Sequence, residues 1–319
     1  MKTIIRAVLL MVLIGGLYAC NSEPTQDEAS IEPKIVEVRA VYDSENDLHL
    51  FETETDTIMA GWTTFRLVNA SPFVHFIFFD YLPGNRTSKD LLSDVSPVFQ
   101  ESSYLIMEGK DDEAMAAFAK LPEWFGELVF RGGTGYTSPG RSAETTLFMA
   151  PGNYVLECYI KMPDGTYHWS MGMYKDLHVT TDTTSAQAPQ SPDIEITVTD
   201  AGLQVVGKPS TGEQLVAVHF EQDNPGLIGK DVHLAKLDES TEAIEVAEWL
   251  DFMTAKGLVS TVENPGPATF IGGTHEMPKG NTAYFVVNLD PGRYVWVAEQ
   301  QIADMAMEEF TVEEETDSE

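Results

Sequence analysis

Three side chains that can bind a soft metal ion lie close together in the sequence. Cys158, His168 and Met173 belong to one segment, Cys-Tyr-Ile-Lys-Met-Pro-Asp-Gly-Thr-Tyr-His-Trp-Ser-Met-Gly-Met, at the end of a strand-like run. A thiolate and two imidazoles form the trigonal plane of a blue-copper site, and a thioether supplies its weak axial ligand. The second imidazole must come from elsewhere, and His75, in an apolar run, is the candidate. The pattern therefore predicts one copper ion per chain, bound by His75, Cys158, His168 and Met173.

Each of these residues also has a simpler interpretation. Cys158 shares a strand face with Leu156 and Ile160, and a lone buried cysteine is commonly a small apolar core residue. His75 can be a core histidine that is hydrogen-bonded to the backbone, and Met173 can be core filling. A metal-free β-sandwich module that binds a protein or glycan at the cell envelope is therefore the alternative function.

The N-terminal sequence predicts export from the cytoplasm. A basic start precedes an apolar run at 7–17, which has the pattern of a secretory signal and is too short to span a bilayer. Leu-Tyr-Ala-Cys, ending at Cys20, resembles the lipobox of bacterial lipoproteins, which implies lipidation of Cys20 and anchoring in the cell envelope, at the periplasmic or surface face of the outer membrane. Ordinary signal cleavage is the alternative. Cys158 would then be the only thiol of the mature chain, and an unpaired cysteine in an oxidising compartment calls for burial or a metal.

The chain is strongly acidic, with 51 Asp and Glu against 19 Lys and Arg and a net charge of −32. Such a charge repels phosphate backbones and anionic lipid headgroups, so nucleic-acid binding is excluded and the lipid anchor is the expected membrane contact. Solubility or a salty habitat explains this acidity simply. A more specific explanation is that it steers a cationic redox partner, such as a cytochrome, to the protein.

An internal repeat predicts two related domains. Nine identical residues, mostly Gly, Pro and aromatic, recur at a constant offset of 140 when 130–155 is placed on 270–295, and His75 pairs with His233 upstream of the repeat. The predicted organisation is a signal peptide (1–19), a tether (20–32), a first domain (33–180), a linker (181–192), a second domain (193–312) and an acidic tail (313–319).

Short runs rich in β-branched and aromatic residues predict strands in both domains. They lie at 65–69, 73–79, 145–149, 154–160 and 177–179, and 194–199 alternates cleanly. Strands of this length and spacing are typical of a β-sandwich. Helices are expected only in the insertions, at 111–120 and at 240–256.

Several motifs together resemble the plastocyanin-like cupredoxin superfamily. They are Asn69 followed by His75, Pro-Gly-Asn-Tyr-Val-Leu-Glu-Cys, and Asp-Gly-Thr-Tyr-His-Trp-Ser-Met-Gly-Met. The resemblance implies an all-β fold of two tandem Greek-key β-sandwich domains with short helical insertions, and the copper ligands named above. Small electron-transfer cupredoxins place the histidine two to four residues after the cysteine, whereas nine residues intervene here; copper nitrite reductases have a similarly long loop.

The second copy is expected to lack a copper site. Ala298 replaces Cys158 and no histidine follows it, so this domain is interpreted as a docking or stabilising partner, with His233 and His275 either structural or facing solvent. The chain has no His-x-His pair for a trinuclear cluster, and its remaining histidines offer no evident second copper site for nitrite reduction. The predicted function is therefore single-electron transfer by a copper protein rather than enzymatic catalysis.

Overall fold

A computed structural model describes residues 31–223, 229–299 and 306–314. The predicted signal peptide, Cys20 and most of the acidic tail lie outside these residues. Within them, no helix is both long and apolar enough to cross a membrane.

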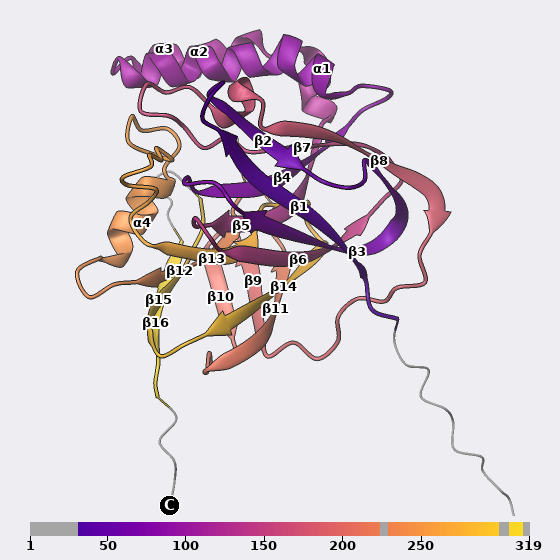
Figure 1. Ribbon diagram of the computed structural model, residues 1–319, viewed down its shortest axis with the longest axis vertical. Coiled ribbons are helices and arrows are strands. Elements are labelled where there is room, and N and C mark those ends of the chain that lie inside the picture. Colours follow the sequence, from indigo (N-terminus) through magenta and orange to yellow (C-terminus); the bar gives the residue numbers. More distant parts are fainter. Residues whose placement is uncertain (1–30, 224–228, 300–305, 315–319) are drawn as a thin grey trace, which may run out of the picture. The chain divides into compact units, whose positions relative to one another are not determined.

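The first half of the described chain contains eight strands (Figure 1). They are β1 (Lys34–Asp43), β2 (Leu48–Glu52), β3 (Thr57–Asn69), β4 (His75–Leu82), β5 (Val129–Thr137), β6 (Ser142–Met149), β7 (Gly152–Glu157) and β8 (Tyr174–Thr183). β1 lies between β2 and β3, and β3 pairs with β6. In the other sheet β4 lies between β5 and β7, and β7 pairs with β8. Phe65 on β3 packs against Phe79 on β4, with ring centroids 4.5 Å apart, so the two sheets share one core.

The second half repeats these eight strands in the same order. They are β9 (Ile194–Thr199), β10 (Gly202–Val206), β11 (Gly212–Phe220), β12 (Val232–Leu237), β13 (Thr269–Thr274), β14 (Thr282–Leu289), β15 (Gly292–Val297) and β16 (Met307–Val312). β9 pairs with β10 and β11, β11 with β14, β12 with β13 and β15, and β15 with β16. The predicted all-β class with two tandem sandwiches is confirmed; the predicted domain limits stay a prediction.

Both sheets continue from one half into the other. β6 pairs antiparallel with β14, and β5 with β13, so each strand pairs with its own counterpart. The pair Thr145↔Phe285 joins two residues related by the offset of 140, which places a pseudo-twofold axis at this point. Gly135 lies directly against the backbone of Gly272, where a side chain would collide. These glycines thus allow the halves to approach closely and cover each other's sheet edges.

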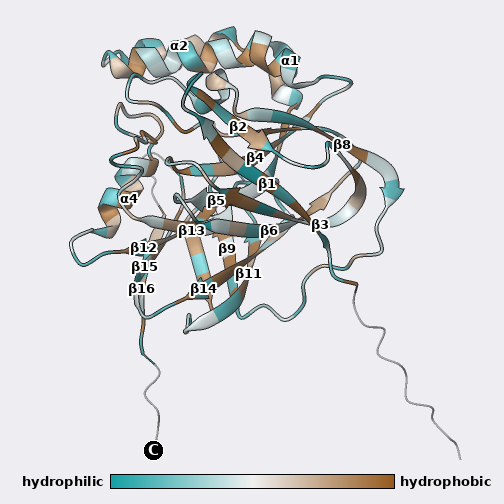
Figure 2. Ribbon diagram, viewed as in Figure 1, coloured by the Kyte–Doolittle hydropathy of each residue, from teal (hydrophilic) through white to brown (hydrophobic). Residues whose placement is uncertain are grey.

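The helices lie in the insertions, as predicted, but their extents differ. Between β4 and β5 the chain forms α1 (Ser88–Asp90), η1 (Leu91–Val95), α2 (Ser96–Met107), α3 (Asp111–Ala117), η2 (Phe118–Lys120) and η3 (Glu123–Glu127); η4 (His168–Met171) follows β7, and α4 (Ala243–Leu250) follows β12. Figure 2 shows hydrophobic residues concentrated on the strands and hydrophilic residues mixed in along α2. α3 with η2 matches the helix expected at 111–120. α2 was not predicted, because three of its buried residues are serines and weaken the apolar pattern.

The helix predicted at 240–256 is too long at both ends. Asp238 accepts hydrogen bonds from the backbone N–H groups of Ser240 and Thr241 and holds them in a turn. Helix α4 instead starts after Glu242, which forms a capping box with Glu245. Most strands extend beyond the short runs predicted for them, and β8 continues to Thr183, into the segment predicted as a linker. The strand predicted at 154–160 is an exception, because β7 ends at Glu157 and Cys158 lies just after it.

Candidate metal centre

His75 is the first residue of β4 and is held by a tightly bonded turn before it. Asn69 donates side-chain hydrogen bonds to the carbonyls of Phe73 and Thr137, at 2.7 and 2.8 Å, and accepts one from the N–H of Ser71. The Ser71 hydroxyl lies 2.8 Å from Nε2 of His75. This turn fixes the ring so that Nδ1 of His75 faces the interior. The sequence motif included Asn69 without assigning it a role, and the structure shows that it positions the ring of His75 through this turn.

The long segment between Cys158 and His168 folds back on itself as a hairpin. Lys161 and Tyr167 form an antiparallel bridge, and the N–H of His168 donates to the carbonyl of Ile160 at 2.9 Å. A tight turn at Gly165 closes the hairpin. Backbone hydrogen bonds fold these nine residues into a hairpin, so His168 lies near Cys158 despite the long segment between them.

The donor atoms of three predicted ligands converge. Nδ1 of His75 lies 3.3 Å from Nδ1 of His168 and 3.6 Å from Sγ of Cys158, and all three residues are fully buried. A tetrahedral ion bound at about 2.0–2.1 Å to nitrogen and about 2.3 Å to a thiolate separates two nitrogen donors by about 3.3 Å, and nitrogen from sulfur by about 3.6 Å. The two observed separations, both measured from His75, match these values.

The electrostatics favour neutral imidazoles at this site. Burial lowers the pKa of His75 and of His168 well below the usual value, and the neighbouring histidines lower each of them further. Burial also raises the pKa of the Cys158 thiol to about 12. A thiolate here therefore needs a cation beside it, and a bound metal ion would supply that charge.

Met173 is placed beside the other predicted ligands through its backbone. Its N–H donates to the carbonyl of His168 at 3.0 Å, and its carbonyl accepts from the N–H of Cys158 at 3.3 Å. Gly172, with φ of 106°, ends η4 in the left-handed region and turns the chain into this position. Met173 is fully buried. Its role as the axial ligand stays a prediction.

A third histidine lies at the centre and was missed in the sequence. His49, on β2, stacks on His168 with ring centroids 3.7 Å apart and an interplanar angle of 12°. It is buried, and neither of its ring nitrogens has a hydrogen-bond partner. One ligand atom from each of His49, His75 and His168 lies within 4.8 Å of the others. The inward position of His49 in a short alternating strand was the available signal, but β2 pairs with β1, far from the other ligands in sequence.

A second buried cluster lies where the two halves meet. Asp231, His233, His275 and Glu299 each offer a ligand atom within 4.8 Å of the others. Of the two alternatives predicted for His233 and His275, the structure favours a structural role over a solvent-facing one, because their exposed fractions are 0% and 1%. The pairing of His75 with His233 is wrong. On the pairing strands β7 and β15, Phe78 faces Glu157 and His233 faces Val297, so the counterpart of His233 is Phe78.

Hydrogen bonds already satisfy much of this second cluster. Nε2 of His233 lies 2.6 Å from Asp231, and its Nδ1 accepts weakly from the N–H of Tyr136 at 3.4 Å. Glu299 accepts from the hydroxyls of Tyr136 and Tyr159, which belong to the first half. Both nitrogens of His233 are thus used by the protein itself. We interpret the cluster as a polar network that joins the halves.

Comparisons with known proteins give distant structural likenesses only. No protein-family model matches the chain, and no curated protein is detectably similar. A multicopper oxidase structure is similar over 87% of this chain and 88% of its own, at 12% identity and a TM-score of 0.24. Copper nitrite reductase from Nitrosomonas europaea is similar over 90% of this chain and 96% of its own chain, at 12% identity and a TM-score of 0.23.

Auracyanin A, a "blue" copper protein from Chloroflexus aurantiacus, covers 46% of this chain and 99% of its own, at 14% identity and a TM-score of 0.27. The structures that match are thus copper proteins of the predicted cupredoxin type, matching either both halves or one. Because the identities and TM-scores are low, these likenesses carry no argument about function. The architecture is defined by the chain's own strand pairing.

Proposed function

We propose that this protein binds one copper ion through its first half and transfers single electrons. The observation that supports this proposal is that Nδ1 of His75 lies 3.3 Å from Nδ1 of His168 and 3.6 Å from Sγ of Cys158, which are separations expected for ligands of one ion. Two imidazoles with a thiolate are the ligand set of blue-copper sites. Copper bound there would supply the change between Cu(II) and Cu(I), with Met173 as the proposed weak axial ligand.

The chain's own residues prepare this site for electron transfer rather than for substrate chemistry. A metal on Nδ1 of His75 requires the ring proton on Nε2, where Ser71 can accept it. Ser71 is itself fixed by Asn69, so the ligand cannot rotate away. Burial of all three donors excludes water and substrate from the first coordination sphere. A rigid, dry site of this kind changes little between oxidation states.

Copper titration of the full chain tests the proposal. We expect one Cu(II) per chain and an intense visible charge-transfer band, which Cys158→Ser should abolish because the band requires the thiolate. His178→Gln is the matched control, since His178 lies on β8 in the same half, is exposed, and its side chain contacts Asn153 rather than any proposed ligand. A colourless titration of the unaltered chain would leave the metal-free binding module as the better function.

We further propose that the protein is anchored in the cell envelope through a lipid on Cys20. The support is the sequence alone, because one lipid modification is the only membrane attachment that the pattern before Cys20 predicts. Cys20→Ser should shift the protein from the membrane fraction to the soluble fraction or leave an unprocessed precursor. Fractionation of this variant with the membranes would refute the anchor without touching the copper proposal.

The proposed redox partner is a protein with a cationic face, such as a cytochrome. The chain's net charge of −32 supports this proposal, because complementary charge accelerates encounter. The association rate should fall steeply as the screening length decreases to about 10 Å and below. A rate that ignores ionic strength would show that the acidity serves solubility.

A further inference from the structure

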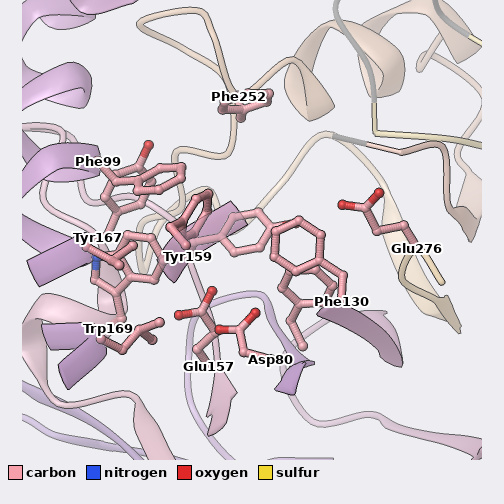
Figure 3. A pocket seen from close by; sticks show the side chains of 13 residues that line it. Asp80, Phe99, Phe130, Glu157, Tyr159, Tyr167, Trp169, Phe252 and Glu276 are labelled. Atoms are coloured by element: carbon pink, nitrogen blue, oxygen red, sulfur yellow. The ribbon is translucent and has the colours of Figure 1, made fainter. Parts of the chain in front are cut away.

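A cavity of about 60 Å³ lies beside the proposed copper loop, between the helical insertion and the sheet that contains β4 and β7. Its wall is mostly aromatic and includes Tyr159, Tyr167 and Trp169, whereas three carboxyl side chains, Asp80, Glu157 and Glu276, also reach it. Figure 3 shows Asp80 and Glu157 side by side below the rings.

Both halves of the protein build this cavity. Asp80 on β4 and Glu157 on β7 lie on the same face of the sheet, since Phe78 pairs with Glu157 two residues before Asp80. η1 and α2 close one side, and their apolar residues pack against Leu82 and Val155 of the sheet. Glu276 follows β13 in the second half. The longer insertion of the first half therefore has a structural consequence, because it encloses the cavity.

Two of the three carboxyl groups in the cavity lack partners that buried acids normally have, whereas Glu276 accepts a hydrogen bond from the N–H of Gly229. Asp80 and Glu157 are 2% and 4% exposed, and Oδ1 of Asp80 and Oε2 of Glu157 have no hydrogen-bond partner. No ion pair among the described residues involves Asp80, Glu157 or Glu276. Burying such groups without compensation costs free energy, which a cation in the cavity would offset.

We propose that this cavity binds a small organic ammonium ion. The negative faces of aromatic rings attract cations, and several rings around an ammonium group form the aromatic cages that bind choline and methylated lysine. Burial raises the pKa of Asp80 and of Glu157, and a cation beside them would favour their ionised forms. The two carboxylates would then bind the charged nitrogen while the rings cover its carbon atoms. An inorganic cation fits less well, because a wall made mainly of aromatic carbon cannot replace its hydration shell.

The cavity is adjacent to the proposed copper ligands along the chain. Glu157 and Tyr159 flank Cys158, and Tyr167 and Trp169 flank His168. If the proposed copper site is correct, a bound ammonium ion should also perturb the colour of the copper protein. Binding of the cation itself does not depend on copper, so the two proposals can fail separately.

The test is calorimetric titration of the metal-free full chain with benzylammonium and with benzyl alcohol, its neutral counterpart of similar shape. We expect benzylammonium to bind at least about tenfold more tightly. The double variant Asp80→Asn/Glu157→Gln should lose this preference and keep its affinity for benzyl alcohol. It should still fold, because the amides have nearly the shape of the carboxyl groups they replace and remove buried charge.

Glu37→Gln is the control, since Glu37 is an exposed residue of β1 remote from the cavity and its loss changes the net charge only. It should leave both affinities unchanged. Equal binding of the two probes would overturn the proposal and show a purely apolar cavity. Absence of binding by either probe would also overturn it, and would identify the carboxyl pair as a structural part of the core.

Discussion

The two buried polar clusters of this protein use similar side chains in opposite ways. At the proposed metal centre, His49 has no partner for either ring nitrogen, Nε2 of His168 has none, and Nδ1 of His75 faces only His168 and Cys158. At the boundary between the halves, His233 is bonded at both nitrogens, and Asp231 accepts from the N–H of Glu299 at 2.6 Å. Donor atoms that the protein leaves unpaired are available to a metal, whereas hydrogen-bonded groups contribute to stability. The boundary cluster is satisfied only in part, because Nε2 of His275 and Oε1 of Glu299 have no partner.

The strand register explains how the repeat produced this difference. Ala298 stands at the position of Cys158, and the counterpart of His75 is Lys230, so the second half lost its metal ligands. Near the pseudo-twofold axis, the first half contributes Phe78 and Tyr159 where the second half contributes His233 and Glu299. The duplicated surface thus became aromatic on one side and ionisable on the other, which allows the halves to bind each other specifically.

Replacement of one histidine from each cluster should give the largest difference between the two clusters, measured as the copper colour. His75→Gly should abolish the copper colour, and added imidazole should restore it by filling the opened coordination position. His233→Gly should leave the colour intact, because no atom of His233 belongs to the copper ligand set. Visible absorption of both variants with equimolar copper makes the comparison. Equal loss of colour in the two variants would contradict the division into a metal site and a structural network.

Asp231→Asn should be the most destabilising single change in the boundary cluster. Burial alone would raise the pKa of Asp231, but the charges and hydrogen bonds of His233 and His275 outweigh it and lower that pKa to about 2. Removal of one partner from such a buried pair costs roughly 3–5 kcal/mol. Urea unfolding at neutral pH measures the change. A loss below about 1 kcal/mol would show that the network is dispensable.

Asp80→Asn should have a smaller effect of the opposite sign. Burial raises the pKa of Asp80 to about 8 from its usual value of 3.8. The folded state therefore retains a proton that the unfolded state has lost, and this residue's contribution to stability declines as the pH rises from about 4 to about 8. Asparagine does not titrate, so the urea midpoint of the variant, relative to that of the unaltered chain, should rise as the pH increases from 5 to 8. A pH-independent difference would mean that Asp80 is already ionised at pH 5.

Met173→Leu should have the most subtle effect. A weak axial ligand tunes the reduction potential of a blue-copper site more than it holds the metal. We expect the variant to bind copper and stay coloured while its reduction potential changes. Met277→Leu, a buried methionine of the second half, is the control and should leave the potential unaltered. Release of copper from Met173→Leu would show that this residue is an essential ligand or packing group.

The sequence alone was sufficient for the fold class and the repeat, and it identified His75, Cys158 and His168, of which His75 lies close to the other two. Short β-branched runs bounded by Gly and Pro residues are typical of strands, and they predicted the β-sandwich. The constant offset of 140 between identical turn residues predicted the two related halves. Cys158 and His168 belong to one loop, so their association is a local property of the chain. The apolar run around His75 predicted a central strand, and the structure contains it as β4.

Only the tertiary structure decided which distant residues lie beside the ligands that were found in the sequence. His49 reaches the centre because β2 pairs with β1, and the serine-rich α2 exists because the sheet offers it a surface to cover; neither depends on a local pattern. The strand register, not the spacing, determined that His233 corresponds to Phe78. The cavity with Asp80 and Glu157 arises from the same cause, since two acids far apart in sequence become neighbours only when β4 and β7 pair. Long-range pairing brings together side chains whose sequence separation carries no signal, and this is the physical limit of prediction from the sequence.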